Sequence, residues 1–217
     1  MNPYAAWWKD SGRPAPEKPL LVLAFDDDPT AVSALPLDYA TGWLDRQTPT
    51  SRVADYLHVP IAAAGDDLPE HDLLLLGSVG RGMTTLAAAF AVSQFNAEPQ
   101  LVTGHGSGIN DLQWMDKLID VRSREMPDVP APVARLVAVL EQTEVPVLLD
   151  GVMAAAAAAL VAPDSDVQAP VLGSEPVQRF FLDRANVPVW GDSGIGPGEG
   201  LGALSGLAML RLALLAG

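Results

Sequence analysis

The most constraining feature of the sequence is a set of short runs that are apolar almost throughout. Residues 20–25 read LLVLAF, residues 73–76 are four leucines, and residues 145–149 read VPVLL. A strand that is apolar at every position has both of its faces buried, which is typical of a parallel sheet covered by helices. Each run leads into a turn with glycine or an acid, and helical segments follow. This alternation predicts a Rossmann-like three-layer α/β fold, with a mostly parallel sheet and helices on both faces.

The rest of the chain completes this expected layout. Further strands are predicted at residues 59–63, 99–103, 171–172 and 187–190. Helices are predicted at residues 37–57, 86–95, 112–121, 133–142, 154–161 and 177–184, and in the apolar segment that follows residue 202. Residues 1–19 contain two tryptophans and several prolines. They are expected to form an irregular N-terminal arm whose tryptophans pack against another surface. Residues 20–217 are expected to form a single α/β domain.

The composition excludes several classes of partner and chemistry. The formal net charge is −14, which argues against nucleic acid, because proteins that bind a phosphate backbone carry a basic face. The absence of cysteine excludes disulfides, thiolate metal sites and a cysteine nucleophile. No secretory signal pattern is visible, and the apolar run at residues 154–161 is too short for a membrane span. We therefore expect a soluble, cytoplasmic protein that acts on small molecules.

Two glycine-rich turns have the pattern of a phosphate site. Residues 77–85 join a strand to a helix start with Thr84, where free N–H groups and the helix dipole attract anions. No lysine precedes the threonines, so this is not a Walker A loop, and a plain capped turn explains it nearly as well. Residues 104–111 form the second turn, with Lys117 about two helical turns further on. His105 lies in this turn with no other histidine nearby, and the chain has no cysteine, so no metal site is expected.

Acids stand in two of the turns. Glu199 lies in the last glycine-rich turn, residues 194–202, where a carboxylate held close to the main chain can accept a proton. The alternative is that Glu199 only favours the N-terminus of the next helix. Asp26 follows the first strand, at the edge of the sheet where ligands bind in open α/β folds. There the alternative is a solvated turn in which Asp28 or Thr30 caps a helix.

Taken in order, these turns resemble those of the nicotinate-nucleotide:dimethylbenzimidazole phosphoribosyltransferases. The similar stretches are residues 22–27, 32–36, 77–85, 104–111 with Lys117, 146–159, 174–176 and 196–203. They include a Pro-Val-x-x-Asp-Gly strand followed by alanines and a Gly-Glu-Gly-x-Gly-Ala turn. No single match is specific, but seven in the same order, over roughly residues 20–214, indicate a short, divergent member of this family.

The resemblance implies an enzyme of the glycosyltransferase type. It would move phosphoribose from nicotinate mononucleotide to a benzimidazole-type base, in the pathway that makes the lower ligand of cobalamin. Glu199 would be the general base that accepts the proton lost by the incoming base. The residues implied to bind the substrates are Asp26, Ser33, Leu35, Ser78, Gly80, Gly82, Thr84, Gly106, Lys117, Asp150, Ser174 and Gly198. No cofactor is expected, and the protein is expected to be a homodimer.

The sequence also departs from the family pattern. Ser78 stands where the family has Glu, and Gly196 where it has Arg, although Arg81 could partly replace the lost cation. Leu35 replaces a Tyr and Gly42 a Gln, and the serine of the Ser-x-Glu-Pro turn is displaced by one position. The loss of the acid at position 78 favours a second reading, a non-catalytic paralogue that binds a nucleotide or riboside, alone or together with a full-length homologue. The retained Gly198-Glu199-Gly200 opposes this reading.

A third reading comes from the first strand and its acids. Phe25-Asp26-Asp27-Asp28-Pro29-Thr30 fits the Asp-x-Asp-x-Thr motif of haloacid-dehalogenase-like phosphatases, with Asp26 as the nucleophile. Trp190-Gly191-Asp192 is loosely similar to the last acidic motif of those enzymes. This hypothesis explains two segments and leaves the remaining turns without a role.

Overall fold

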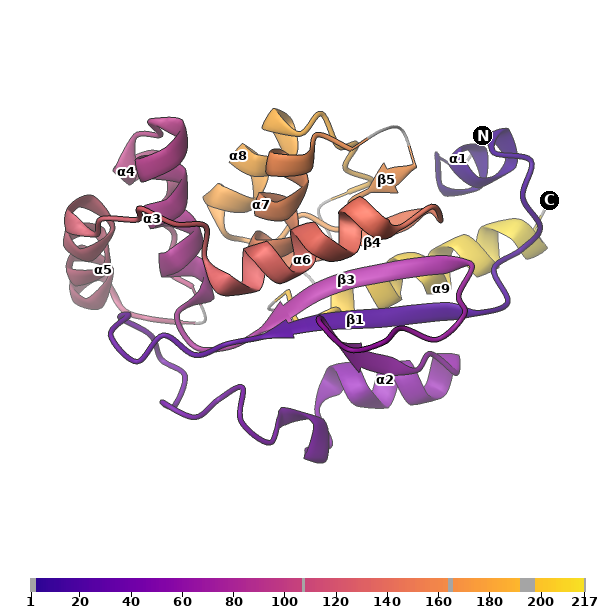
Figure 1. The fold of residues 1–217 in the computed structure, drawn as a ribbon, viewed down its shortest axis with the longest axis horizontal. Helices are drawn as coiled ribbons and strands as arrows, with labels where there is room; N and C mark the ends of the chain where they lie inside the picture. The colour runs from indigo at the N-terminus through magenta and orange to yellow at the C-terminus, as the bar shows by residue number, and fades with distance from the viewer. Residues whose placement is uncertain (1–2, 107, 164–165, 192–197, 217) are drawn as a thin grey trace.

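A five-stranded parallel sheet forms the centre of the molecule (Figure 1). The structure is a computed structural model that describes residues 3–106, 108–163, 166–191 and 198–216. The strands are β1 (Pro19–Phe25), β2 (Ile61–Ala63), β3 (Leu73–Val79), β4 (Val147–Leu149) and β5 (Val167–Gln168). Their order across the sheet is β2-β1-β3-β4-β5, and each neighbouring pair is parallel. The predicted α/β fold is confirmed.

Helices cover both faces of the sheet, and successive strand residues divide between them. One face carries α3 (Met83–Phe95), α6 (Ala131–Gln142), α7 (Gly151–Val161) and α8 (Pro176–Arg184). The other face carries α1 (Pro3–Asp10), α2 (Pro49–Leu57) and α9 (Leu201–Leu215). In β3, Leu74 and Leu76 join the first core, whereas Leu73 and Leu75 join the second. The unbroken apolar runs are explained by this arrangement, because side chains alternate between two buried faces.

Two helices lie outside this sandwich. The short α4 (Pro99–Val102) and the longer α5 (Asp111–Ser123) pack against α3, at the far left of Figure 1. None of the helices in the described part of the chain is long and apolar enough to cross a bilayer.

The strand order places a crevice at one edge of the sheet. After β1 the chain forms β2 on one side of β1 and then crosses to form β3 on the other side. The connections that leave β1 and β3 therefore run in opposite directions across the sheet. Phe25 pairs with Val79, so the two strands end level and their loops leave together. Ligands in open α/β sheets bind in such a crevice, outside the carboxyl ends of the strands.

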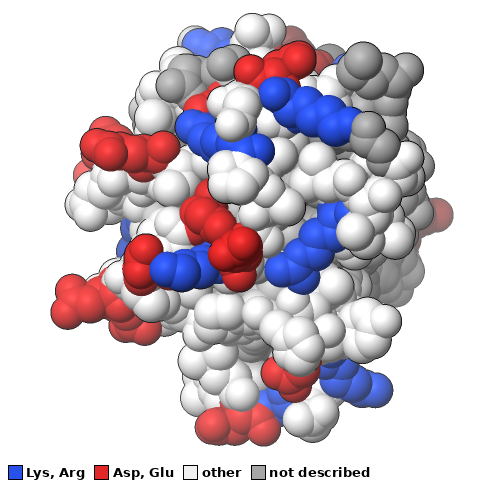
Figure 2. Space-filling view, turned by 90° about the vertical axis from the view of Figure 1, so that its right-hand side faces the viewer, with Lys and Arg blue, Asp and Glu red and all other residues white. Residues whose placement is uncertain are grey.

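The opposite edge, where the strands begin, is shown in Figure 2. Lysine and arginine side chains alternate there with acidic ones and do not gather into one basic field. Two of the ion pairs on this side join Lys18 to Glu70 and Arg13 to Asp166. Paired charges of this kind are unlike the basic stripe that nucleic-acid binding needs.

The predicted elements at residues 99–103 and 37–57 are wrong in kind or in extent. Residues 99–103 form the helical turn α4 and not a strand, because Pro99 suits a first helical position and Thr103 Oγ1 donates to its carbonyl at 2.7 Å. The predicted helix over residues 37–57 is confined to the 3-10 turn η1 (Trp43–Asp45) and to α2. Gly42, at φ 68°, and Pro49, at the start of α2, break the segment.

The edges of the sheet also differ from expectation. The stretch at residues 187–190 makes a single bridge, between Ala169 and Val189, and residues 171–172 join no strand. The short strand β5 lies instead at residues 167–168, where no strand is expected from the sequence. In the N-terminal arm, residues 3–10 are helical and not irregular. There Trp8 is buried in the core that includes α9, which supplies the docking that its tryptophans suggested. The division into arm and domain stays a prediction.

Candidate active site

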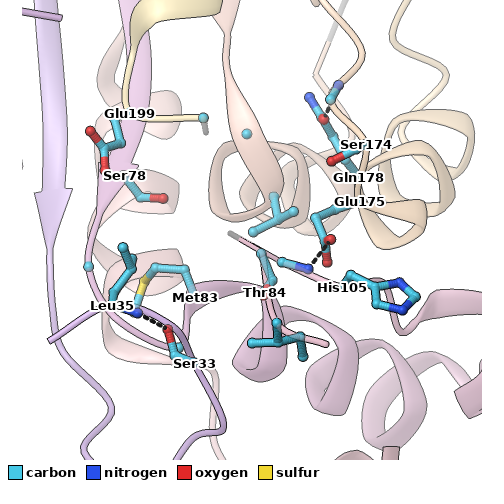
Figure 3. A pocket seen from close by; sticks show the side chains of 18 of the residues that line it. Ser33, Leu35, Ser78, Met83, Thr84, His105, Ser174, Glu175, Gln178 and Glu199 are labelled. Carbon is cyan, nitrogen blue, oxygen red and sulfur yellow. Dashed lines mark hydrogen bonds between the residues drawn. The ribbon is translucent and has the colours of Figure 1, made fainter. Parts of the chain in front are cut away.

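The crevice holds a cavity formed by loops that are far apart in the sequence. Its empty space, with the open solvent at the mouth included, is about 840 Å³. The lining residues are Val32, Ser33, Leu35, Ser78, Gly80, Gly82, Met83, Thr84, His105, Gly106, Ile109, Lys117, Asp150, Gly151, Val152, Gly173, Ser174, Glu175, Gln178, Gly198 and Glu199. Figure 3 shows two ends: Glu199 and Ser78 lie at one, and Glu175, Thr84 and His105 at the other.

Glu199 is a buried acid held by two donors. Its Oε1 accepts a hydrogen bond from the Tyr39 hydroxyl at 2.5 Å, and its Oε2 accepts one from Trp43 Nε1 at 3.4 Å. Burial raises the pKa of Glu199 above its ordinary value, although the two hydrogen bonds oppose the rise. The pKa of the Tyr39 hydroxyl is raised too, by its own burial and by the neighbouring carboxylate. A carboxylate with a raised pKa suits proton transfer near neutral pH.

Asp150 ties the Glu199 turn to the end of β4. It stands at the N-cap of α7, but its side chain does not cap that helix. Instead Asp150 Oδ2 accepts the N–H of Gly202, in the first turn of α9, at 2.9 Å. A Cβ on Gly202 would lie 2.5 Å from Asp150 Oδ1, so only glycine permits this approach. Burial raises the pKa of Asp150 to about 6, and the charge of Glu199 adds to the rise.

The other end of the cavity centres on Lys117, whose side chain is 1% exposed. Its Nζ donates to Thr84 Oγ1 at 2.9 Å and to the Gly104 carbonyl at 2.8 Å, and it pairs with Glu175 Oε2 at 3.4 Å. Burial lowers the pKa of Lys117, and the Glu175 carboxylate opposes that change. The sequence placed Lys117 beside the two glycine turns, and the fold joins it to both.

Gly106 brings a main-chain donor to the same place. Its N–H donates to Glu175 Oε1 at 2.6 Å. Its φ is 62°, in the left-handed region that favours glycine, and an added Cβ would lie 3.1 Å from Thr84 Oγ1. The ammonium of Lys117 and the N–H of Gly106 therefore reach the two oxygens of one carboxylate, and the Thr84 hydroxyl lies beside the ammonium. Donors of these kinds are the ones that bind a phosphate group.

The structure brings the residues singled out in the sequence into one cavity, with one exception. Asp26 does not line it. Its carboxylate accepts the N–H of Asp27 at 3.0 Å, while its carbonyl lies against Gly80. Arg81 is not a lining residue either, because its guanidinium donates to the carbonyls of Asp28 and Ala31. The functional roles of the lining residues stay predictions, and Gly196 lies outside the described residues.

Sequence reasoning missed several residues of the site. Tyr39 and Trp43 lie in the segment read as a helix, and nothing in their spacing signals a contact with a residue 160 positions away. Glu175 was inside the recognised Ser-x-Glu-Pro turn but was not singled out. Its signal was the acid directly before Pro176 at the start of a helix, a position from which a carboxylate can reach neighbouring N–H groups.

The acids after β1 serve the loop itself. Asp27 accepts the N–H groups of Arg81 and Ala40, at 2.7 and 2.9 Å. Asp28 is bound by Thr30 and Arg124. Within the described residues, no group of three or more acids or histidines could hold a metal ion, and Asp192 of the loosely matched second motif lies outside them. These contacts assign Asp27 and Asp28 to the structure of the loop.

The fold and the site together define a class. They combine a parallel α/β sheet with a cavity at its switch point, which has a buried acid at one end and a buried lysine beside two glycine turns at the other. A family model described as "Phosphoribosyltransferase" matches residues 50–125.

Curated relatives carry a more specific name, nicotinate-nucleotide–dimethylbenzimidazole phosphoribosyltransferase. The one from Salinispora tropica is 37% identical over 84% of this chain and 53% of its own length. The one from Corynebacterium glutamicum strain R is 34% identical over 66% of this chain and 46% of its own length. The chain is related to these proteins, and it spans about half the length of the curated ones it matches.

Solved structures agree at the level of the fold. A crystal structure of CobT from Thermus thermophilus superposes with a TM-score of 0.79, covering 97% of this chain and 86% of that one. The identity of the two sequences is 20%, so this similarity speaks for the fold alone.

Proposed function

We propose that this protein transfers phosphoribose from nicotinate mononucleotide to a benzimidazole-type base. The observation that carries the proposal is the shared cavity: Glu199, a buried acid with a raised pKa, lines the same space as Lys117 and the Gly106 turn. The relatives named above carry the name of this reaction. No resident cofactor is needed, because the two substrates supply all the reacting atoms.

The two ends of the cavity suit the two parts of such a substrate pair. Lys117 and Gly106 would hold the 5′-phosphate. Leu35 and Met83, which lie on the same side of the cavity as Ser78 and Glu199 in Figure 3, would offer an apolar wall to a flat base. Asp150, a second buried carboxyl group, lines the same cavity.

The chemistry then follows from these positions. The bond from ribose C1′ to the nicotinate nitrogen breaks, and its electron pair leaves with nicotinate. An unprotonated ring nitrogen of the incoming base forms the new bond to C1′, and the proton on its other ring nitrogen passes to Glu199. While the old bond breaks, positive charge grows on the ribose, and a nearby carboxylate stabilises it.

Product analysis with nicotinate mononucleotide and a panel of benzimidazoles tests the proposal. We expect base-dependent release of nicotinate from the wild type, and a loss of about 100-fold or more in Glu199→Gln, because general bases typically contribute that much. Glu125→Gln, which changes an exposed acid away from the cavity, serves as the matched control and should keep full activity. Release of nicotinate at the wild-type rate by Glu199→Gln would rule out its role as the base.

A second candidate is a non-catalytic paralogue that binds a nucleotide or riboside, alone or beside a full-length homologue. Two observations favour it: Ser78 leaves the first glycine turn without an acid, and both Glu199 oxygens already accept hydrogen bonds. Binding of nicotinate mononucleotide without any nicotinate release would decide for this candidate.

We also propose that the protein works in the cytoplasm as a homodimer. Support for the dimer comes from α5, on which Leu112, Met115 and Ile119 are 79%, 50% and 60% exposed at helical spacing. Sedimentation at micromolar concentration, compared with a variant carrying Met115→Glu, tests the dimer.

A further inference from the structure

We propose that, while the site is empty, the Glu175 carboxylate occupies the place where the substrate phosphate binds, so that the phosphate must displace it. We call this place, next to the Gly106 N–H and Lys117 Nζ, the phosphate seat. Glu175 thereby sets how strongly the site distinguishes phosphorylated from unphosphorylated ribosides. This inference rests on the proposed function, because it takes the donor set around Lys117 as the place where the phosphate binds.

The donors of this seat are already used by Glu175. One carboxylate oxygen accepts the Gly106 N–H at 2.6 Å, and the other pairs with Lys117 Nζ at 3.4 Å. These are a main-chain donor and a cation from separate elements, and both face the cavity. A phosphate oxygen that bonded either donor would have to take the place of a Glu175 oxygen.

The surroundings are shaped to admit this carboxylate. A Cβ on Gly104 would lie 2.5 Å from Glu175 Oε1 and 2.9 Å from its carboxyl carbon, so any other residue at position 104 would collide with it. Glu175 is the N-cap residue of α8, yet its side chain makes no capping hydrogen bond to that helix. An acid at an N-cap commonly accepts N–H groups of its own helix, so the turn toward Gly106 and Lys117 reflects the attraction of the seat.

The exchange has a predictable effect on selectivity. In the empty site, Glu175 neutralises the buried Lys117 and satisfies the Gly106 N–H, and both would otherwise lose an acceptor. A phosphorylated ligand supplies its own anion to both groups but must first move Glu175 and then bear its repulsion at short range. An unphosphorylated riboside leaves Glu175 in place and is unaffected by its charge.

Calorimetric titration of three ligands can isolate this effect. Nicotinate mononucleotide, ribose 5-phosphate and nicotinate riboside are titrated into the wild type, Glu175→Gln and the control Glu125→Gln at pH 6.5. All titrations share one pH, because burial lowers the pKa of Lys117. Glutamine keeps the size of the side chain and an acceptor for Gly106 N–H but removes the charge.

We expect Glu175→Gln to bind both phosphorylated ligands about tenfold more tightly and the riboside within twofold of the wild type. Glu125→Gln should match the wild type for all three. If Glu175→Gln proves unstable in thermal unfolding, Glu175→Asp, whose shorter side chain reaches the seat less well, should shift affinity in the same direction. Unchanged or weaker binding of the phosphorylated ligands by these variants would overturn the inference, as would a lack of phosphate binding in every form.

The inference and the proposed function fail in different ways. If Glu175→Gln binds ribose 5-phosphate more tightly than the wild type but no form releases nicotinate, the inference about Glu175 holds and phosphoribosyl transfer is refuted. Nicotinate release, together with an affinity for phosphorylated ligands that is the same in the wild type and Glu175→Gln, would support phosphoribosyl transfer and refute the inference about Glu175.

Discussion

Asp150 joins the Glu199 turn to the sheet, and replacing it by asparagine tests whether the ionisation of this buried carboxyl group destabilises the fold. Asp150 is 3% exposed and accepts the N–H of Gly202 at the start of α9. Asparagine keeps one oxygen that can accept this hydrogen bond, but it carries no charge at any pH. The substitution therefore separates the hydrogen bond from the ionisation.

The size of the effect follows from the pKa. Burial raises the pKa of Asp150 from 3.8 to about 6 in the folded protein. A carboxyl group whose pKa is higher when folded contributes stability that is complete below pH 3.8 and is lost as the pH rises through about 6. A difference of about two units corresponds to roughly 3 kcal/mol. The wild type should therefore lose roughly 2–3 kcal/mol relative to Asp150→Asn between pH 4 and pH 7.

Urea unfolding followed by tryptophan fluorescence at pH 4, 5, 6 and 7 measures this difference. The quantity to compare is the free energy of unfolding of the variant minus that of the wild type, because other acids titrate equally in both. Asp128→Asn, at an exposed position, is the matched control and should show no such trend. A difference for Asp150→Asn that stays flat across this range would refute the assignment of a raised pKa to Asp150.

Two further predictions concern the opposite ends of the cavity. Tyr39→Phe removes a donor that lowers the pKa of Glu199, so the acid limb of the pH–rate profile of nicotinate release should move to higher pH. The free energy of unfolding should fall by about 1 kcal/mol. An unmoved pH–rate profile would contradict the link between Tyr39 and Glu199. Gly106→Ala should weaken nicotinate mononucleotide binding and destabilise the fold by about 1–2 kcal/mol, because its φ is 62° and Thr84 crowds the new Cβ. Gly12→Ala, at φ 68° with nothing within 4 Å, should show the strain without the binding defect, and equal binding by both variants would count against a phosphate seat at Gly106.

The sheet could be predicted from the sequence because its signal is local. Leu20–Phe25 and the leucines of β3 are apolar at consecutive positions, and only a strand covered on both faces buries them all. The elements that failed carry weaker local signals. Residues 99–103 read PQLVT and contain only two large apolar residues, and β5 has only two residues. The states of such short segments depend on neighbours that the pattern does not reveal.

The site was predictable only in part, for a related reason. Glycine turns and acids at strand ends mark the carboxyl edge of a parallel sheet, so Glu199, Lys117 and Asp150 could be grouped before any contact was known. Tyr39, Trp43 and the orientation of Glu175 could not, because each depends on a partner from a distant segment. Asp26 shows the converse, since its place after a strand suggested a ligand contact that the path of its loop does not provide.

The sequence by itself determined that alternating apolar runs and glycine turns build a parallel sheet with one ligand-binding edge, since burial periodicity and backbone freedom are properties of short segments. Only the tertiary structure decided which side chains meet at that edge. Whether Glu199 is held by Tyr39, and whether Glu175 faces Lys117 or its own helix, depends on how loops far apart in the chain come to share one low-dielectric cavity.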